Sequence, residues 1–189
     1  IENHLRVLAE GLARRGHEVS VIVCHPQQRN EIEIINGVRV IRAARVRTIA
    51  STPLSFELPK LIAQEKPDIT HLQFPYPVGE VSHWLYGHGR TVITYQSDVV
   101  RQRMIGALYK PLMRQVLRRA DSLLATSPNY VVSSTELIRL GRRCLVLPLG
   151  VDVDRFAAPQ RVKQKRPTLL FIGRHRYYKG LSDLLKAMP

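Results

Sequence analysis

The feature that most constrains the fold is a regular alternation of short apolar runs with longer segments whose apolar residues recur at helical spacing. We expect strands at residues 18–24, 32–35, 38–41, 69–74, 91–95, 122–125 and 144–147. We expect helices at residues 2–15, 53–65, 79–86, 99–119 and 128–140. Strands that are apolar on both faces and alternate with helices are typical of a parallel sheet covered by helices on both sides. The sequence therefore predicts an α/β fold, with Asn36-Gly37 as a hairpin turn.

A polar stretch at residues 157–166 interrupts this alternation and carries four cations. We interpret it as a linker between a first domain at residues 1–156 and a second unit at residues 167–189. The chain begins inside one expected element and ends inside another, so we expect it to be a fragment of a longer protein.

The second unit begins with an expected buried strand at residues 168–172, followed by Gly173 and a loop that carries Arg174 and Lys179. A helix is expected to start after Gly180. A strand, a glycine turn, fixed cations and a helix start can together hold an anion at the carboxyl edge of a parallel sheet. The sequence therefore predicts an anion site in this unit.

Polar residues follow four expected strands of the first domain. Ligands of open parallel sheets bind beyond the carboxyl ends of the strands, which makes these positions candidates for a cleft. The candidates are Gln73 near His71, then Gln96-Ser97-Asp98, then Ser127, and finally Gly150. Each has a structural alternative: Ser127 before Pro128 and Asp98 before a helix can be plain N-caps, and a lone histidine is more often an interior residue. What favours a cleft is that all four positions fall at successive strand ends.

The chain is strongly basic, with 29 Lys and Arg against 15 Asp and Glu and a net charge of +14. This excess suits phosphate-bearing partners such as nucleotides, anionic lipid or nucleic acid. The expected helix at 99–119 carries several of the cations, which form either a solvated face or a surface for an anionic membrane. Tyr109 is the single aromatic residue among these cations, so the cations do not alternate with stacking aromatic residues, which argues against nucleic acid.

The sequence motifs of several kinds of functional site are absent. The histidines are scattered without metal-ligand spacing, so no metal site is predicted. A dinucleotide-binding glycine motif, a phosphate-binding loop and a serine-hydrolase elbow are all absent, which disfavours the corresponding enzymes. Cys24 and Cys144 lie in separate apolar runs and are interpreted as free thiols of a reducing compartment.

An ordered set of segments that spans nearly the whole chain forms a recognisable pattern. The segments are Ile1-Glu2-Asn3-His4-Leu5, Gly16-His17-Glu18-Val19, Tyr95-Gln96-Ser97-Asp98-Val99-Val100-Arg101-Gln102, Ala125-Thr126-Ser127-Pro128-Asn129-Tyr130, Leu147-Pro148-Leu149-Gly150-Val151-Asp152, Phe171-Ile172-Gly173-Arg174 and Tyr178-Lys179-Gly180. Together they resemble glycosyltransferase family 4, whose GT-B architecture has two Rossmann-like, doubly wound domains that face each other across a cleft.

The resemblance implies a retaining glycosyltransferase that moves a sugar from a nucleotide diphosphate sugar to a glycan or lipid-linked acceptor, with no obligatory metal or cofactor. Gly173, Arg174 and Lys179 then contact the donor diphosphate. Gln96 and Asp98 are expected to be catalytic. The expected acceptor and cleft residues are Glu2, Gln73, Ser97, Ser127 and Gly150. The resemblance also implies a cytoplasmic enzyme, peripheral on the inner face of the membrane, and it favours mannose as the sugar.

The chain departs from the family pattern at two positions. The family usually has histidine where this chain has Gln96, and it often has a second histidine where Gln73 stands. An amide cannot carry a proton or a charge. The family's Glu-x7-Glu pair for the donor sugar falls beyond the chain. These departures leave open a non-catalytic sugar or nucleotide binder of the same fold, and the charge alone leaves open a nucleic-acid-binding protein.

Overall fold

The computed structural model describes residues 2–49, 52–98, 103–141, 144–151, 153, 168–173, 175 and 177–188. By their contacts, the residues divide into two units, Ile1–Asp152 and Val153–Pro189. The predicted linker at 157–166 lies outside the described residues.

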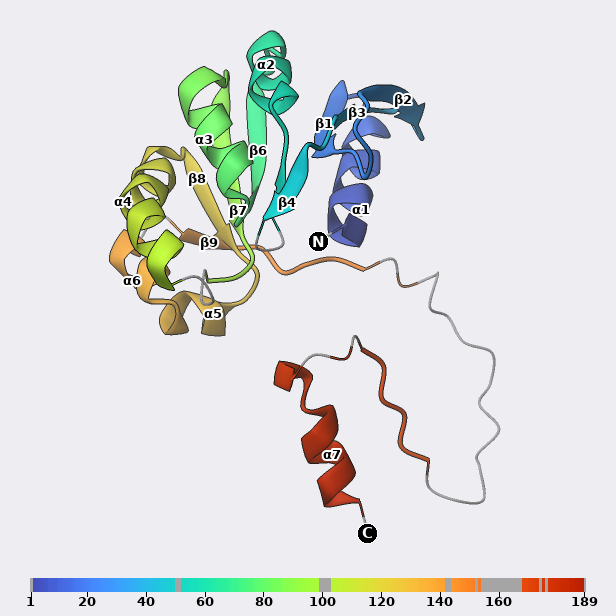
Figure 1. Cartoon of the computed structure of the whole chain (residues 1–189), viewed down its shortest axis with the longest axis vertical. Coiled ribbons are helices and arrows are strands. Elements are labelled where there is room, and N and C mark those ends of the chain that lie inside the picture. The colour runs from blue at the N-terminus through green and yellow to red at the C-terminus, as the bar shows by residue number, and fades with distance from the viewer. Residues whose placement is uncertain are drawn as a thin grey trace. The chain divides into compact units, whose positions relative to one another are not determined.

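The first unit alternates strands with helices (Figure 1). Its strands are β1 (Val19–Cys24), β2 (Glu31–Ile35), β3 (Val38–Ala43), β4 (Arg47–Ile49), β5 (Thr52–Leu54), β6 (Ile69–Phe74), β7 (Arg90–Tyr95), β8 (Ser122–Ala125) and β9 (Cys144–Val146). Its helices are α1 (Glu2–Ala13), α2 (Glu57–Gln64), α3 (Pro77–Tyr86), α4 (Arg103–Arg119), α5 (Pro128–Ser133) and α6 (Thr135–Leu140).

The strands form one parallel sheet and two smaller arrays. The parallel sheet has the order β6-β7-β8-β9, so each strand lies beside its neighbour in sequence. A second sheet has the order β1-β3-β2, with β1 parallel to β3 and β2 antiparallel to it. Asn36 and Gly37 join β2 to β3 with positive φ angles of 49° and 81°, as a tight hairpin turn requires. The predicted α/β fold and the hairpin are confirmed.

Two predicted helices have different bounds. Pro53 does not open a helix: it lies in β5 opposite Thr48 of β4, in a two-stranded ribbon where proline is tolerated because both strands are edges. The predicted helix at 128–140 is two helices, because Ser134 between them is extended and its hydroxyl accepts a hydrogen bond from the N–H of Leu137. A serine hydroxyl at this position caps the second helix and competes with a continuous one.

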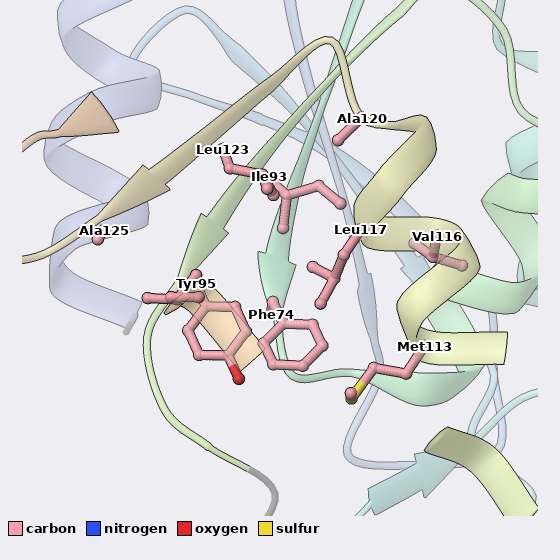
Figure 2. Packing of buried hydrophobic residues seen from close by; sticks show 10 residues of the cluster. Phe74, Ile93, Tyr95, Met113, Val116, Leu117, Ala120, Leu123 and Ala125 are labelled. Carbon is pink, nitrogen blue, oxygen red and sulfur yellow. The ribbon is translucent and has the colours of Figure 1, made fainter. Parts of the chain in front are cut away.

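The core of this unit lies between α4 and the parallel sheet (Figure 2). Apolar side chains from α4 pack on residues of β6, β7 and β8, and Leu137 of α6 completes the cluster. The buried side chains of α4 include Met113, Val116 and Leu117, and the buried Ala120 directly follows the helix. At the carboxyl end of the sheet, the rings of Phe74 and Tyr95 stack with their centroids 4.4 Å apart.

The second unit does not contain the predicted buried strand. The described residues 168–173 form no strand, and Leu170 and Ile172 are 79% and 84% exposed. A parallel strand needs a neighbour for its backbone hydrogen bonds, and no other extended segment occurs among the described residues of this unit. The predicted helix after Gly180 is present as α7 (Leu181–Ala187), preceded by a 3₁₀ turn at Tyr177–Lys179.

In the part of the chain that the structure describes, no helix is both long and apolar enough to cross a membrane.

Candidate active site

The predicted site residues of the first unit share one edge of the parallel sheet. Gln73 is the penultimate residue of β6, Gln96 directly follows β7, Ser127 follows β8 and Gly150 lies beyond β9. Because these parallel strands are neighbours in that order, their carboxyl ends meet at the same edge. The structure therefore brings together the four strand ends that the sequence singled out.

Gln73 and Gln96 form a hydrogen-bonded pair at the centre of this edge. The Nε2 of Gln96 donates to the Oε1 of Gln73 over 2.5 Å, and the backbone N–H of Gln96 donates to the carbonyl of Phe74 over 3.1 Å. Both side chains are half-buried. We call them the amide pair. Because each amide carries one acceptor oxygen and two N–H donors, the pair keeps further hydrogen-bonding capacity for hydroxyl groups.

His71, on β6, extends this hydrogen-bond network from Gln73 to Thr94 on β7. Its Nε2 lies 2.7 Å from the Oγ1 of Thr94 on β7 and 3.5 Å from the Nε2 of Gln73. Burial lowers the pKa of His71, and the nearby His4 lowers it further. The imidazole is therefore neutral at pH 7. The predicted cleft residue Glu2 is exposed at the start of α1.

Asp98 is hydrogen-bonded to the fold behind the amide pair. Its Oδ1 accepts from the hydroxyl of Tyr95 over 2.7 Å and from the hydroxyl of Ser134 over 2.8 Å. Burial and the Asp98 carboxylate raise the pKa of Tyr95 above its usual range, and burial with the same carboxylate raises the pKa of Tyr130 to about 12. Asp98 thus ties the loop after β7 to the start of α6, while Ser97 beside it is exposed. The structure gives Asp98 a positioning role, and the predicted catalytic role stays a prediction.

Ser127 and Gly150 have positions that ordinary structural roles explain. The hydroxyl of Ser127 accepts from the N–H of Tyr130 over 3.2 Å, with Pro128 at the first helical position, so the N-cap interpretation of Ser127 is confirmed. Gly150 is exposed, and a Cβ built there would meet nothing within 4 Å. At Gly150 the fold itself therefore does not require a glycine.

The predicted donor residues lie in the second unit and stay predictions. Gly173 and Lys179 are exposed, and Arg174 lies outside the described residues. Among the described residues there is no group of three or more His, Cys, Asp or Glu side chains that could hold a metal ion.

The cations of α4 are partly engaged within the fold. Arg114 donates from Nε and Nη2 to the two carboxylate oxygens of Glu136, both over 2.9 Å. The guanidinium of Arg119 lies 5.2 Å from the ring of Trp84. Of the predicted basic face, Arg101 falls outside the described residues. These contacts reduce the number of α4 cations that are available to a membrane.

Sequence reasoning missed a buried glutamate that bonds to the loop after β6. Glu80 lies in the first turn of α3 and is 1% exposed. Its carboxylate accepts from the N–H of Tyr76 and from the hydroxyl of Tyr109 on α4. Acidic residues in the first turn of a helix are common and usually exposed, so the sequence offered no signal that this one is buried.

Comparisons with known proteins identify the family of the chain. The family model described as Glycosyltransferase Family 4 matches residues 1–155. An O-antigen chain mannosyltransferase C of Escherichia coli is 37% identical over 99% of the chain and 53% of its own length. A D-rhamnosyltransferase WbpZ of Pseudomonas aeruginosa is 33% identical over 100% of the chain and 52% of its own length. A phosphatidyl-myo-inositol mannosyltransferase of Mycobacterium tuberculosis is 26% identical over 100% and 52%.

The chain therefore spans about half the length of the curated relatives it matches. Among solved structures, sucrose-phosphate synthase from Thermosynechococcus elongatus matches with a TM-score of 0.57 and 18% identity, over 80% of this chain and 43% of that one. This likeness shows the fold, which is of the GT-B type that the sequence predicted.

Proposed function

The chain belongs to glycosyltransferase family 4, and from this premise we propose that the protein is a retaining glycosyltransferase that uses a nucleotide diphosphate sugar. The acceptor is a glycan or a lipid-linked glycan, as the names of the mannosyl- and rhamnosyltransferase relatives suggest. The observation that carries the proposal is the amide pair, Gln96 Nε2 to Gln73 Oε1 at 2.5 Å, at the shared carboxyl edge of four parallel strands. Ligands of such sheets bind beyond this edge.

The donor side of the reaction requires positive charge. When the bond between the sugar C1 and the diphosphate breaks, negative charge develops on the leaving phosphate. We assign the stabilisation of this charge to Arg174 and Lys179, with the backbone at Gly173 approaching the diphosphate. Because these groups supply the charge, no metal is required. The support for this assignment is the sequence motif that the three residues share with the family.

The acceptor side is uncharged. The amide pair cannot take up a proton, so Gln96 does not act as a general base. In the step that fits, the acceptor oxygen bonds to the sugar C1 on the face from which the diphosphate departs. The acceptor proton passes to the leaving phosphate oxygen. The amide pair then holds sugar hydroxyl groups in place by donating and accepting hydrogen bonds.

We further propose that mannose from GDP-mannose is the transferred sugar and that the enzyme works at the cytoplasmic face of the membrane. The support is the mannosyltransferase relative that is 37% identical and the basic surface of α4, on which Lys110 is exposed.

The test uses the full-length protein with a panel of nucleotide sugars and a chelator. Transfer or slow hydrolysis of a nucleotide sugar, unaffected by EDTA, is expected. Lys179→Ala should lower kcat/KM by about 10²-fold, the typical loss when one group that stabilises transition-state charge is removed. Lys186→Ala on α7 is the matched control, since it removes a cation of the same unit outside the motif. Failure to bind any nucleoside diphosphate and to turn over any nucleotide sugar would contradict the proposal.

The alternative of a non-catalytic sugar or nucleotide binder is favoured by the two glutamines at positions 73 and 96. Such a protein would bind a nucleoside diphosphate tightly but would show no transfer with any acceptor. Binding to duplex DNA that disappears at physiological salt would assign the interaction to the net charge alone.

A further inference from the structure

Tyr76, in the loop that follows β6, is held from three directions. Its hydroxyl donates to the carbonyl of Pro53 on β5 over 3.0 Å. The same hydroxyl lies 3.0 Å from the Sγ of Cys24, at the end of β1, and can accept from that thiol. Its ring lies on the first turn of α3, where a Cβ at Gly79 would approach it to 2.6 Å. Tyr76 therefore joins the end of β6 to elements outside the parallel sheet.

The backbone of Tyr76 is held by Glu80. The Oε1 of Glu80 accepts from the N–H of Tyr76 over 2.5 Å, and the Oε2 accepts from the hydroxyl of Tyr109 on α4. Both carboxylate oxygens are thus engaged, one by the loop and one by the helix that packs on the core. We call Glu80 and Tyr109 the carboxylate clamp.

Burying this carboxylate costs free energy. Glu80 is 1% exposed, its burial raises its pKa, and among the described residues it makes no ion pair. A buried acid without a cation is unfavourable unless hydrogen bonds compensate. The two hydrogen bonds of Glu80 link α4 to the loop after β6. The position of that loop matters because Gln73 precedes Tyr76 by only three residues.

The clamp and the amide pair are connected through the backbone. The carbonyl of Phe74, two residues before Tyr76, accepts from the N–H of Gln96, and the rings of Phe74 and Tyr95 stack. A shift of Tyr76 would therefore move the end of β6, and with it the side chain of Gln73. Since Gln96 donates to Gln73, both amides depend on the same anchor.

We infer that Glu80 and Tyr109 are positioning residues for the amide pair, because together they hold Tyr76 and through it the end of β6. This inference rests on the proposed function for its kinetic consequence, while the hold on Tyr76 can be measured without any activity.

The first measurement uses Cys24 as a reporter of Tyr76. All other cysteines of the full-length protein, including Cys144, are replaced by serine, and the rate at which a thiol reagent labels Cys24 is recorded. In Glu80→Ala and Tyr109→Phe the labelling rate should rise about tenfold, because the released Tyr76 no longer covers the thiol and no longer bonds to it. Glu80→Gln should label like the parent, since its amide oxygen still accepts from the N–H of Tyr76 and its NH₂ can donate to Tyr109.

The matched control is Ser82→Ala. Ser82 is a buried residue of the same helix whose hydroxyl donates to the carbonyl of Val78 over 2.6 Å, away from Tyr76. Its loss tests whether any weakening of α3 exposes Cys24. We expect its labelling rate to match that of the parent.

The second measurement is transfer kinetics on the same variants. Glu80→Ala and Tyr109→Phe should lower kcat and raise the KM for the acceptor about tenfold, with the KM for the nucleotide sugar unchanged, because the donor contacts lie in the second unit. Glu80→Gln should restore both values. Ser82→Ala should be unaffected.

The outcomes separate the inference from the proposed function. Unchanged Cys24 labelling in both Glu80→Ala and Tyr109→Phe overturns the inference, whatever the activity. Faster labelling with unchanged kcat and acceptor KM overturns the positioning role as well. Faster labelling in a parent protein that transfers no sugar supports the clamp, and the proposed function alone fails.

Discussion

Two neighbouring regions at the carboxyl end of the parallel sheet use opposite chemistry. The half-buried amide pair, Gln73 and Gln96, is uncharged and lies at the edge where a ligand can bind. Two carboxyl groups a few residues further along the chain, Glu80 after Gln73 and Asp98 after Gln96, accept hydrogen bonds from tyrosine and serine hydroxyls. Ionisable groups therefore hold the structure, and neutral groups face the expected substrate.

This difference predicts which substitutions should lower the stability of the protein and which should lower its turnover. A carboxylate that satisfies buried donors is costly to remove, because the donors remain buried without partners. A half-exposed amide has water to replace its bonds. Changes at the carboxyl groups should therefore affect folding and geometry together, whereas changes at the amide pair should affect turnover alone.

The largest effect is expected from Asp98→Ala. The hydroxyls of Tyr95 and Ser134 would each lose an acceptor, so the free energy of unfolding should fall by about 2–5 kcal/mol. Chemical denaturation of the full-length protein measures this loss. Asp98→Asn retains the Oδ1 acceptor and should lose less. A variant Asp98→Ala that unfolds like the parent but transfers no sugar would contradict the positioning role and favour the catalytic one.

A smaller effect, dependent on pH, is expected from Glu80→Gln. Burial raises the pKa of Glu80 from its usual 4.5, so the folded state keeps the proton at pH values where the unfolded state has released it. The stability that this proton linkage contributes is present below 4.5 and falls as the pH rises towards the folded pKa. Tyr109, which contacts the carboxyl, stays protonated because burial and Glu80 raise its pKa. Relative to Glu80→Gln, the parent should therefore lose stability as the pH rises from 4 to 8.

The control for this comparison is Glu136→Gln, for which the sign is reversed. The hydrogen bonds from Arg114 hold the pKa of Glu136 below its usual 4.5, so the stability that Glu136 contributes is present above 4.5 and is lost as the pH falls through its folded pKa. Thermal melts from pH 8 down to well below pH 4.5 measure both variants, because the effect of Glu136 appears only at the acidic end. Parallel pH profiles for the two variants would contradict the contrast between a clamped and an ion-paired carboxylate.

The smallest effect on folding is expected from Gln96→His. The side chain is half-buried and its partner is another amide, so the free energy of unfolding should change by about 0.5 kcal/mol or less. The transfer rate should acquire a pH dependence between about 5 and 8, where a histidine titrates. Stopped assays at several pH values measure it. A flat profile in the parent and a new slope in Gln96→His are expected, whereas an equal slope in both would mean that another group of the parent titrates in this range.

The sequence predicted the parallel sheet and its edge because both follow from local patterns. Residues 69–74 and 91–95 match the pattern of short strands, and Gln73 and Gln96 stand at their ends, so strand polarity alone places them together. The same reasoning failed at residues 168–172, because a parallel strand depends on neighbours that a local pattern does not contain.

The interior of the site could not be predicted in this way. That Asp98 bonds to Ser134, and Glu80 to Tyr109, depends on contacts between residues 36 and 29 positions apart. The predicted helix at 79–86 includes Glu80, but the neighbouring residues indicate neither that its side chain is buried nor that it bonds to Tyr109. Ser134 likewise divides one expected helix in two through a hydroxyl cap.

The two principal sheets of the first unit share no backbone ladder among the described residues. Tyr76, which follows β6 of one sheet, bonds through its hydroxyl to Cys24 in β1 of the other. Amide protons in β1–β3 and in β6–β9 therefore have no common hydrogen-bonded network through which to open together. Hydrogen exchange should report two cooperative units, and the side chain of one tyrosine contributes to how closely their opening is coupled.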